Sequence, residues 1–571
     1  MISPSLLDVV VVSAVLVFFA VFSDKGQRYW RSQYKLPPGP RGVPVFGNIF
    51  QVSALRPHPQ FLQWAREYGE IFHLRLGPQT MIVLNTAEAA DELFMNRSKN
   101  YSGRSAPHVG HDILSDGQRI VFLPYGKEWK AARKSVQAAT GPGPSKRLRH
   151  IQDLESRTLL KDLLDYGDGH GRASQFCKPT EEVPEDHWFS LFRRYATSVV
   201  MMVTYGKRAH RIHDNPQLHK IYEVVANFVN VAQPGNYLAD AFPIMRKLPD
   251  CLAPWRVKAR EMHLWEMELW GGLLDEHKES TLKNGVSPDC YISSYLRSRE
   301  EHGHAEATGS GITEDGWMRD KFLTYVAASV LEAGSDTTSS AALAFVLFML
   351  SSPSALKKAR EEIDTVVGDH RLPDFDDQVN LPYVVACVKE TLRKHPPVPM
   401  GVPHRSEQDD IYKGSFIPKG STVIGNVWAI HMDPVRYPNP TVFDPDRFYN
   451  KGCSTSWSSG PDAHDRDHYV FGWGRRFCQG ALIAEASLFM ICARIIWAFN
   501  FSTPKDPDGG CSLLPDADDE DGTWSDGFVR VPKTFPVVWN ARSDSKAAMI
   551  RKISDDLQLE WQSMGLEPDS T

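Results

Sequence analysis

The chain has 571 residues with a formal net charge of −6, and 42% of its residues are hydrophobic. This balance, with no basic patch interleaved with aromatic residues, excludes nucleic acid as a partner. Eight cysteines occur without the C-x-x-C spacing of zinc sites, which predicts reduced, mostly buried thiols in a reducing compartment. By length alone, the chain would form about three or four domains.

The first residues predict a targeting segment. Residues 6–22 are almost continuously apolar, interrupted only by Asp8 and Ser13, and are just long enough for a membrane-spanning helix. No Lys or Arg precedes this stretch, although a cleaved signal peptide, the alternative, normally begins with a basic region. Basic residues instead follow it, which places the rest of the chain in the cytosol by the positive-inside rule. We therefore expect residues 1–24 to be a signal anchor.

A basic, proline-rich hinge is expected over residues 25–48. Pro37 and Pro38 cannot continue a helix, so this part of the hinge should be extended and stiff. After the hinge, alternating apolar residues predict short strands at 71–76 and 81–84. From about residue 153 onward, helical periodicity dominates.

Two later segments allow more than one interpretation. Residues 322–350 are apolar nearly all round, as in a second membrane helix or a helix buried in a protein core. Polar residues in the middle, such as Glu332 and Ser335, favour a buried helix beside a polar reaction site. Residues 456–466 predict an exposed, polar insertion.

The last stretch, residues 543–571, predicts an amphipathic helix that packs on the body of the protein or on a membrane. Its apolar residues recur at helical spacing, at Ile550, Ile553, Leu557, Trp561 and Met564.

The densest motif centres on a cysteine. It has the form F-x-x-G-x-R-x-C-x-G, with fixed positions at Phe471, Gly474, Arg476, Cys478 and Gly480. The glycines permit a tight turn before the sulfur and close packing after it, and an aliphatic helix follows. Near a helix N-terminus a cysteine is favoured as its thiolate. The pattern favours a ligating thiolate beside a large flat group over a buried structural cysteine.

This loop resembles the haem-ligand loop of the cytochrome P450 family, and four further family motifs occur in the family's order. They are W-x-x-x-R at Trp129 and Arg133, A-G-S-D-T-T at 333–338, E-x-x-R at Glu390 and Arg393, and the segment that contains Arg447. The five motifs span about residues 36–542. The resemblance implies a mainly α fold with a small β lobe, in which residues 49–542 form a single haem domain.

The resemblance also implies which residues hold the cofactor, haem b (iron protoporphyrin IX). Cys478 would be the axial ligand of the iron, and Phe471 would exclude water from that side. Three residues would bind the haem propionates, namely Arg476, Trp129 and Arg133. His404 would either join them or act only as a hydrogen-bonded strand histidine.

Thr337 and Asp336 resemble the family's acid–alcohol pair, which delivers protons for dioxygen cleavage. Gly334 would open a groove in the same helix. The alternative is that Thr337 only satisfies a backbone carbonyl. By the same resemblance Glu390, Arg393 and Arg447 form a structural ion-pair lock behind the haem.

The function implied is a haem-thiolate monooxygenase that inserts one oxygen atom of O2 into a hydrophobic small molecule. Electrons would come from NADPH through a separate NADPH-cytochrome P-450 reductase, with cytochrome b5 as a second donor. The enzyme would sit in the endoplasmic reticulum membrane by one span, with its catalytic domain in the cytosol. The amino-acid sequences of residues 125–129 and 426–434 are similar to those of fungal enzymes of secondary metabolism. Alternatives are xenobiotic detoxification, a haem-thiolate isomerase and a non-catalytic haem protein.

Overall fold

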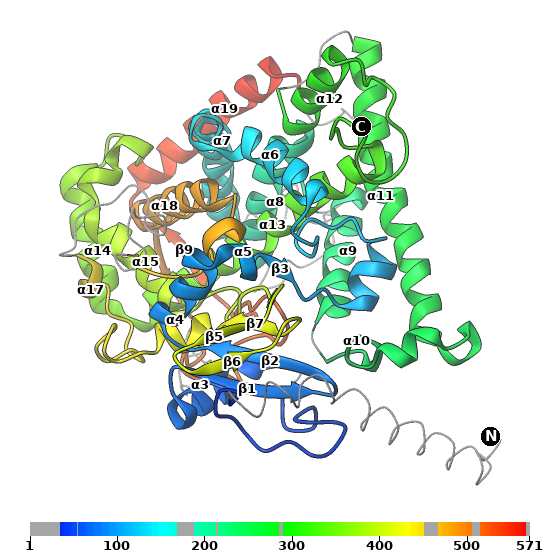
Figure 1. The fold of residues 1–571 in the computed structure, drawn as a ribbon. Coiled ribbons are helices and arrows are strands. Elements are labelled where there is room, and N and C mark those ends of the chain that lie inside the picture. The colour runs from blue at the N-terminus through cyan, green and yellow to red at the C-terminus, as the bar shows by residue number, and fades with distance from the viewer. Residues whose placement is uncertain are drawn as a thin grey trace.

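The computed structural model describes residues 35–53, 55–167, 188–212, 215–233, 235–284, 289–449, 466–504 and 514–566. The predicted signal anchor lies outside these residues, as do the first part of the hinge and nearly all of the predicted insertion at 456–466. Helices dominate the described residues and most of the short strands gather in one lobe (Figure 1). The predicted mainly α fold with a small β lobe is confirmed.

Twelve longer helices form the described part of the body. They are α3 (Pro57–Tyr68), α6 (Lys127–Thr140), α7 (Pro142–Gly167), α8 (Trp188–Tyr205), α9 (Pro216–Ala232), α11 (Pro254–Asn284), α12 (Tyr291–Glu301), α13 (Asp320–Ser351), α14 (Pro353–Val366), α15 (Pro382–Lys394), α18 (Ala481–Ala498) and α19 (Asp544–Ser563). Proline opens α3, α9, α14 and α15, where its fixed φ and missing N–H suit the first helical turn.

Short helical segments connect these elements. They are α4 (Ala87–Asp91), η1 (Glu92–Asn96), α5 (Ser98–Tyr101), η2 (His108–Leu114), α10 (Leu238–Ala241), η4 (Pro243–Lys247), η5 (Asp250–Leu252), η6 (Phe375–Asn380), α16 (Val427–His431), α17 (Asp446–Tyr449) and η8 (Gly474–Arg476).

The largest sheet lies below the helical body in the view of Figure 1. Its strand order is β1-β2-β7-β4-β3, formed by β1 (Ile71–Leu76), β2 (Gln79–Leu84), β7 (Thr422–Gly425), β4 (His404–Arg405) and β3 (Gly103–Arg104). β1 and β2 pair antiparallel and confirm both predicted strands, while β2 and β7 pair parallel. Two-stranded sheets are formed by β5 (Asp410–Tyr412) with β6 (Ser415–Ile417), and by β8 (Phe499–Ser502) with β9 (Val538–Ala541).

The described part of the proline-rich hinge is docked on this sheet. The backbone N–H of His73 in β1 donates to the carbonyl oxygen of Pro38 at 2.8 Å. Gly39 lies so close to His73 that a Cβ would overlap the His73 carbonyl oxygen. Residues 36–42 form no helix, and the backbone at Pro38 and Gly39 lies against β1.

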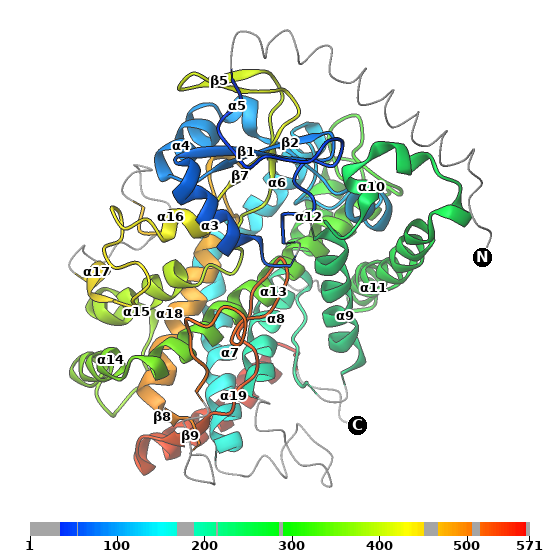
Figure 2. The same ribbon diagram turned by 90° about the horizontal axis from the view of Figure 1, so that it is seen from below.

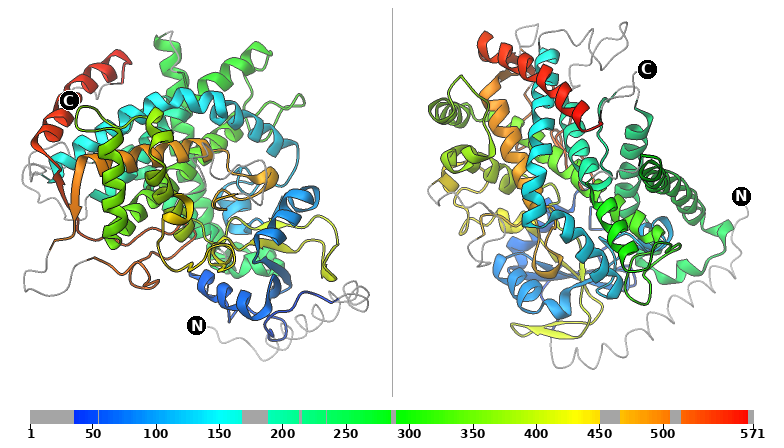
Figure 3. Two further views of the ribbon diagram at one scale, coloured as in Figure 1. Left: turned by 90° about the vertical axis from the view of Figure 1, so that its left-hand side faces the viewer. Right: turned by 90° about the horizontal axis from the view of Figure 1, so that it is seen from above.

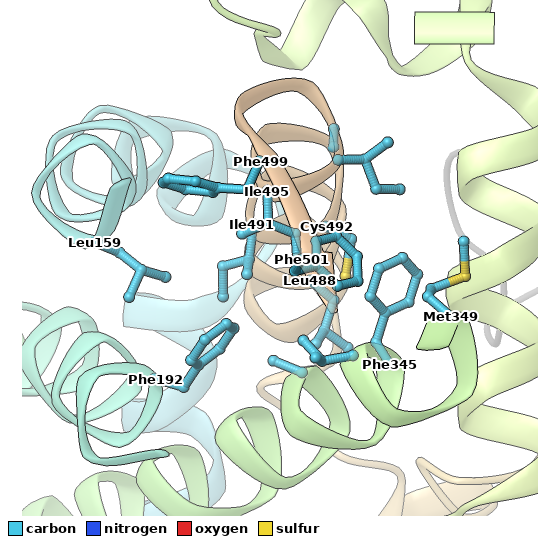
Figure 4. Close-up of a cluster of buried hydrophobic side chains, with 14 of the residues drawn as sticks. Leu159, Phe192, Phe345, Met349, Leu488, Ile491, Cys492, Ile495, Phe499 and Phe501 are labelled. Carbon is cyan, nitrogen blue, oxygen red and sulfur yellow. The ribbon is translucent and has the colours of Figure 1, made fainter. Parts of the chain in front are cut away.

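The apolar stretch around 322–350 forms α13, which packs against α8, α15 and α18 (Figure 2). α13 and α18 are both long and apolar enough to cross a membrane, yet 72% and 78% of their most apolar windows are buried inside the protein. Figure 4 shows Phe345 of α13 beside Leu488 and Cys492 of α18. Of the two interpretations of this stretch, the buried core helix is the one that the structure supports.

The predicted C-terminal helix is α19, which lies along α7 (Figure 3). Trp561 is 4% exposed and packs in one cluster with Ile151, Leu154 and Met202. The Arg208 guanidinium lies over its ring at 4.1 Å. The helix therefore packs on the body of the protein.

We expect Trp561→Ala to lower the free energy of unfolding by about 3–5 kcal/mol, because it empties a buried indole site. Leu559 lies on the same helix but is 65% exposed, so Leu559→Ala serves as the matched control. Chemical denaturation of the two variants checks this. Equal denaturation midpoints would show that α19 adds nothing to the core.

Candidate active site

Cys478 lies in the loop between η8 and α18. Its backbone N–H donates to the carbonyl oxygen of Phe471 at 2.9 Å, which closes the loop. Gly474 has a φ of +54°, and a Cβ there would overlap the carbonyl oxygen of Phe94, so the turn requires glycine, as predicted. A Cβ on Gly480 would meet only the Cys478 sulfur, at 3.9 Å. Contacts within the protein therefore do not by themselves require the second glycine.

The loop borders a cavity of about 380 Å³ that Cys478 lines. Residues of α13 contribute to the lining, as do residues 470–480 and the start of α18. On balance the pKa of the Cys478 thiol is raised, because burial and the nearby Glu485 outweigh the backbone N–H groups of Gly480 and Ala481 and the guanidinium of Arg133, which lower it. The amides at the start of α18 are the groups that would stabilise a thiolate bound to a metal.

Three arginines converge at one part of this cavity, and each donates to a backbone carbonyl. Arg133 donates to Phe477 (2.8 Å), Arg476 to Ser102 (2.9 Å) and Arg104 to Val402 (2.6 Å). Burial lowers the pKa of Arg476 to about 9, and burial together with its two arginine neighbours holds the pKa of Arg104 well below its usual range. Among the described residues that line the cavity there is no Asp or Glu.

These uncompensated cations are the structural test of the expected cofactor. A guanidinium that is partly removed from water is costly unless an anion pairs with it, and here three half-buried ones face one cavity. A flat molecule that carries two carboxylates and offers a metal to a thiolate fits this donor set. Haem is such a molecule.

Trp129 and His404, the other predicted propionate partners, also line the cavity. The guanidinium carbons of Arg476 and Arg133 lie 4.4 and 5.5 Å from the Trp129 ring centroid. His404 Nδ1 lies 2.7 Å from the carbonyl oxygen of Tyr101 and donates to it, so the strand hydrogen bond is present. Burial holds the pKa of His404 well below its usual range. Its Nε2 can donate to a propionate only from the imidazolium form, which a nearby carboxylate would favour.

α13 brings Gly334 and Thr337 to the cavity. A Cβ on Gly334 would lie 2.5 Å from Cγ2 of Val200 in α8, so the packing of these two helices requires glycine here. The Thr337 hydroxyl donates to the carbonyl oxygen of Ala333 at 2.7 Å. Thr337 therefore makes the backbone bond that the structural alternative predicts, and it also lines the cavity as a catalytic hydroxyl must.

Asp336 does not line the cavity with Thr337. Its carboxylate receives two bonds from Arg193 of α8, from Nε at 2.9 Å and from Nη2 at 3.3 Å. The Arg193 guanidinium also lies over the ring of Tyr222 in α9, at 3.8 Å. The carboxylate is thus held between α13 and α8, beside the cavity.

The remaining cavity lining is mostly apolar, as expected for a hydrophobic substrate. From the family resemblance we also expected residues 109–121, 228–229, 328–333, 398–402 and 528–529 to line this space, and parts of the first, third and fourth segments reach it, through Ile120, Val121, Ser329, Val330, Ala333, Val398, Gly401 and Val402. Residues 228–229 and 528–529 are absent from the described lining. Glu332, which the sequence left as a candidate to face this space, turns instead to Arg119.

The predicted lock of Glu390, Arg393 and Arg447 is assembled. Arg393 donates from Nε and Nη2 to the two Glu390 oxygens at 2.7 Å each, and Arg447 Nε lies 3.0 Å from the same carboxylate. Glu390 and Arg393 are fully buried. Arg393 also donates to the carbonyl oxygen of His431 at 2.9 Å, so the lock ties α15 to the end of α16.

Arg104 and Arg193 are site residues that the sequence did not reveal. Each is a single arginine outside any motif, and arginines on exposed surfaces are common. Arg104 becomes significant only because β3 pairs with β4 and brings it beside His404.

Comparison with known proteins agrees with this geometry. The family model described as Cytochrome P450 matches residues 37–513. Cytochrome P450 monooxygenase 231 of Postia placenta is 53% identical over 567 residues, 99% of this chain and 98% of that protein. Cytochrome P450 monooxygenase fogE of Aspergillus ruber is 36% identical over 90% of this chain and 88% of that protein.

The fold is also that of a solved structure. A zebra fish cytochrome P450 with abiraterone superposes with a TM-score of 0.64 at 24% identity, over 86% of this chain and 100% of that one. At this identity the likeness shows the fold alone. Together with the family match and the close relatives, it establishes that the chain belongs to the cytochrome P450 family and is a haem-iron monooxygenase.

Proposed function

We propose that this enzyme inserts one oxygen atom of O2 into a hydrophobic small molecule of fungal secondary metabolism, a polyketide, terpenoid or alkaloid. The observation that carries the proposal is the cavity itself, which is lined by Cys478, Thr337 and three guanidiniums, with no Asp or Glu among its described lining residues. Relatives such as fogE of Aspergillus ruber and virE of Hypocrea virens, both named cytochrome P450 monooxygenases, support the fungal assignment.

In this proposal haem b occupies the space between α13 and the cysteine loop. When bound through a thiolate, its iron supplies the activation of dioxygen. Cys478 provides the thiolate, the Gly480 and Ala481 amides keep it anionic, and Phe471 excludes water from the sulfur. The propionates pair with the cations described above.

We assign proton delivery to Thr337 and Asp336. Thr337 presents a hydroxyl to the cavity, and its bond to the Ala333 carbonyl fixes the direction of that hydroxyl. Asp336 and Arg193 keep part of their side chains exposed, at 19% and 32%, so this pair lies between solvent and the cavity wall. The arrangement supports a path in which a proton passes from solvent to the carboxylate and then to the threonine.

Arg104 should be a propionate partner, so Arg104→Leu should weaken haem retention. We expect haem transfer to an apoprotein acceptor to be about 10- to 100-fold faster, as for the loss of one hydrogen bond to a charged group. Arg405, the exposed neighbour on β4, gives the matched control Arg405→Leu. Equal transfer rates for the two variants would remove Arg104 from the cofactor site.

We further propose that electrons arrive from NADPH through a separate cytochrome P-450 reductase, with cytochrome b5 as a second donor. Lys130 and Lys134 on α6 and Arg475 in the cysteine loop are exposed cations near the thiolate side of the cavity. They suit a partner with an acidic surface. Turnover that falls steeply with added salt, and falls further in Lys134→Glu, is the expected result.

Membrane attachment in the endoplasmic reticulum, with a cytosolic catalytic domain, is part of the proposal. Besides the predicted anchor at 6–22, exposed apolar side chains on two neighbouring segments suit a membrane surface. They are Phe50 (75% exposed) before α3 and Leu252 (61%) before α11. Phe46 and Phe242 connect these segments, with ring centroids 5.9 Å apart. Carbonate extraction of microsomes should leave the chain in the membrane pellet.

Two measurements test the function as a whole. The reduced carbonyl-difference spectrum of the purified chain should show the haem-thiolate band. Metabolites of the source organism should then be compared with those of a strain that lacks the gene. A precursor one oxygen atom poorer that accumulates in the deletion strain names the substrate. Turnover driven by peroxides alone, with no need for a reductase, would contradict the proposal.

A further inference from the structure

Arg119 is a fully buried arginine close to the cavity but outside its lining. Its Nε donates to a carboxylate oxygen of Glu332 at 3.0 Å, and its Nη2 donates to the other oxygen. The same Nη2 lies 3.4 Å from both oxygens of Glu266. Its Nη1 donates to the Ser115 hydroxyl at 2.7 Å. Each of the three nitrogens of this guanidinium therefore has at least one oxygen partner.

An aromatic side chain completes the enclosure of Arg119. The ring of Phe228 lies over its guanidinium, 3.7 Å from the carbon to the ring centroid. Phe228 belongs to α9, Glu266 to α11 and Glu332 to α13. α9 and α11 pack beside each other, and α11 also contacts α13 (Figure 1). One side chain thus ties the segment after η2 to three helices.

Arg119 and its partner Glu332 are each followed in the chain by residues that line the cavity. Ile120 and Val121, the next two residues, line the cavity on one side. Ala333 and Gly334, which follow Glu332 directly, line it on another. The Arg119–Glu332 pair therefore joins two walls of the same cavity, each within one or two residues of the lining.

The cluster of two carboxylates and one guanidinium is not expected to add much to the free energy of unfolding. Burial and the charge of Glu332 raise the pKa of Glu266 to about 7, against the opposing effect of Arg119. Buried ion pairs often contribute little net stability, because desolvation offsets their attraction, and apolar replacements of such clusters can be neutral or stabilising. What the directed bonds do supply is a fixed geometry.

We propose that Arg119 is a positioning residue for substrate selection: by binding Glu332 it sets the distance between the Ile120–Val121 wall and α13, and so the size of molecule the cavity admits. The inference rests on the proposed function in one respect, that substrate occupies this cavity beside the haem. It assigns Arg119, Glu332 and Phe228 no contact with the substrate.

The test replaces the whole cluster with apolar residues, because removing Arg119 alone would leave two buried carboxylates unpaired. The triple variant Arg119→Met, Glu266→Leu, Glu332→Leu keeps the buried volume and loses the directed bonds. Glu268→Leu, on the exposed side of α11, is the matched control for lost charge on that helix. The full-length haem proteins are titrated with imidazole and with the bulkier 4-phenylimidazole, and binding is followed by the shift of the haem absorption band.

We expect the ratio of the two dissociation constants to change by at least about tenfold in the triple variant, a typical size for a changed pocket wall, and to stay at the wild-type value in Glu268→Leu. The carbonyl-difference spectrum should stay intact in both, which excludes general misfolding. An unchanged ratio in an intact triple variant would overturn the inference. If the triple variant does not retain haem, the single variants Glu332→Gln and Glu266→Gln are compared instead. The inference requires that Glu332→Gln, which alters the closer pair, shifts the ratio of the two dissociation constants and that Glu266→Gln does not.

Failure of the proposed function gives a different result. A wild-type protein that shows no azole-induced shift would mean that the cavity does not open to the haem, and this outcome would overturn the proposed function and the inference together. A wild-type shift with the same ratio in every variant would overturn only the inference.

Discussion

Replacing Cys478 with alanine is expected to abolish both the haem-thiolate absorption band and all oxygenation. In the described residues that line the cavity, Cys478 is the one thiol that can ligate an iron there. Alanine offers no lone pair, so neither ligation nor the electron donation that favours oxygen–oxygen cleavage can occur. The loss should be complete rather than partial, and product formation should fall below detection.

The control for this experiment is Cys251→Ala, which removes an exposed thiol far from the chemistry in sequence and outside the cavity lining. It should keep the band and the turnover of wild type. Oxygenation that survives in Cys478→Ala would reject the cysteine loop as the site of the haem ligand, and with it the central assignment.

Replacing Thr337 with alanine is expected to leave the haem bound but to separate electron flow from product formation. Thr337 is one of three α13 hydroxyl residues that line the cavity, with Ser329 and Thr338, and it is the one that matches the motif; alanine keeps the helix but removes its hydroxyl. NADPH consumption should continue and release peroxide, while product per NADPH falls by a factor of about 10², as for the loss of a positioned proton donor.

Thr337→Ser is the matched control, because it restores the hydroxyl without the methyl group. It should recover most of the coupling between NADPH and product. Simultaneous measurement of NADPH, peroxide and product checks both variants. Unchanged coupling in Thr337→Ala would leave Thr337 with only its bond to the Ala333 carbonyl.

Local pattern was enough to predict several elements of the fold and part of the site. Alternating apolar residues identified β1 and β2, and helical spacing identified α19. The cysteine motif predicted the Gly474 turn because its chemistry is contained in ten consecutive residues. Glu390 and Arg393 were likewise predictable as a pair, since residues three apart share one face of a helix.

The packing contacts that explain individual residues could not be predicted from local pattern. Gly334 was expected to open a groove, and the structure adds that Val200 of α8 leaves no room for a Cβ there. Asp336 was expected beside Thr337, but consecutive residues on a helix point about 100° apart, and Asp336 meets Arg193 instead. Whether a helix residue faces a cavity or a neighbouring helix depends on what packs around it.

The sequence by itself determined the family and predicted the candidate cysteine ligand and several of the elements, because each motif is made of residues close together in the chain. Only the tertiary structure decided that Arg104 lies beside His404 and that Arg119 pairs with Glu332 and Glu266. A lone arginine has no periodicity and no spacing that marks it. Its role is set by burial, since a guanidinium removed from water must find oxygen partners, and those partners come from distant parts of the chain.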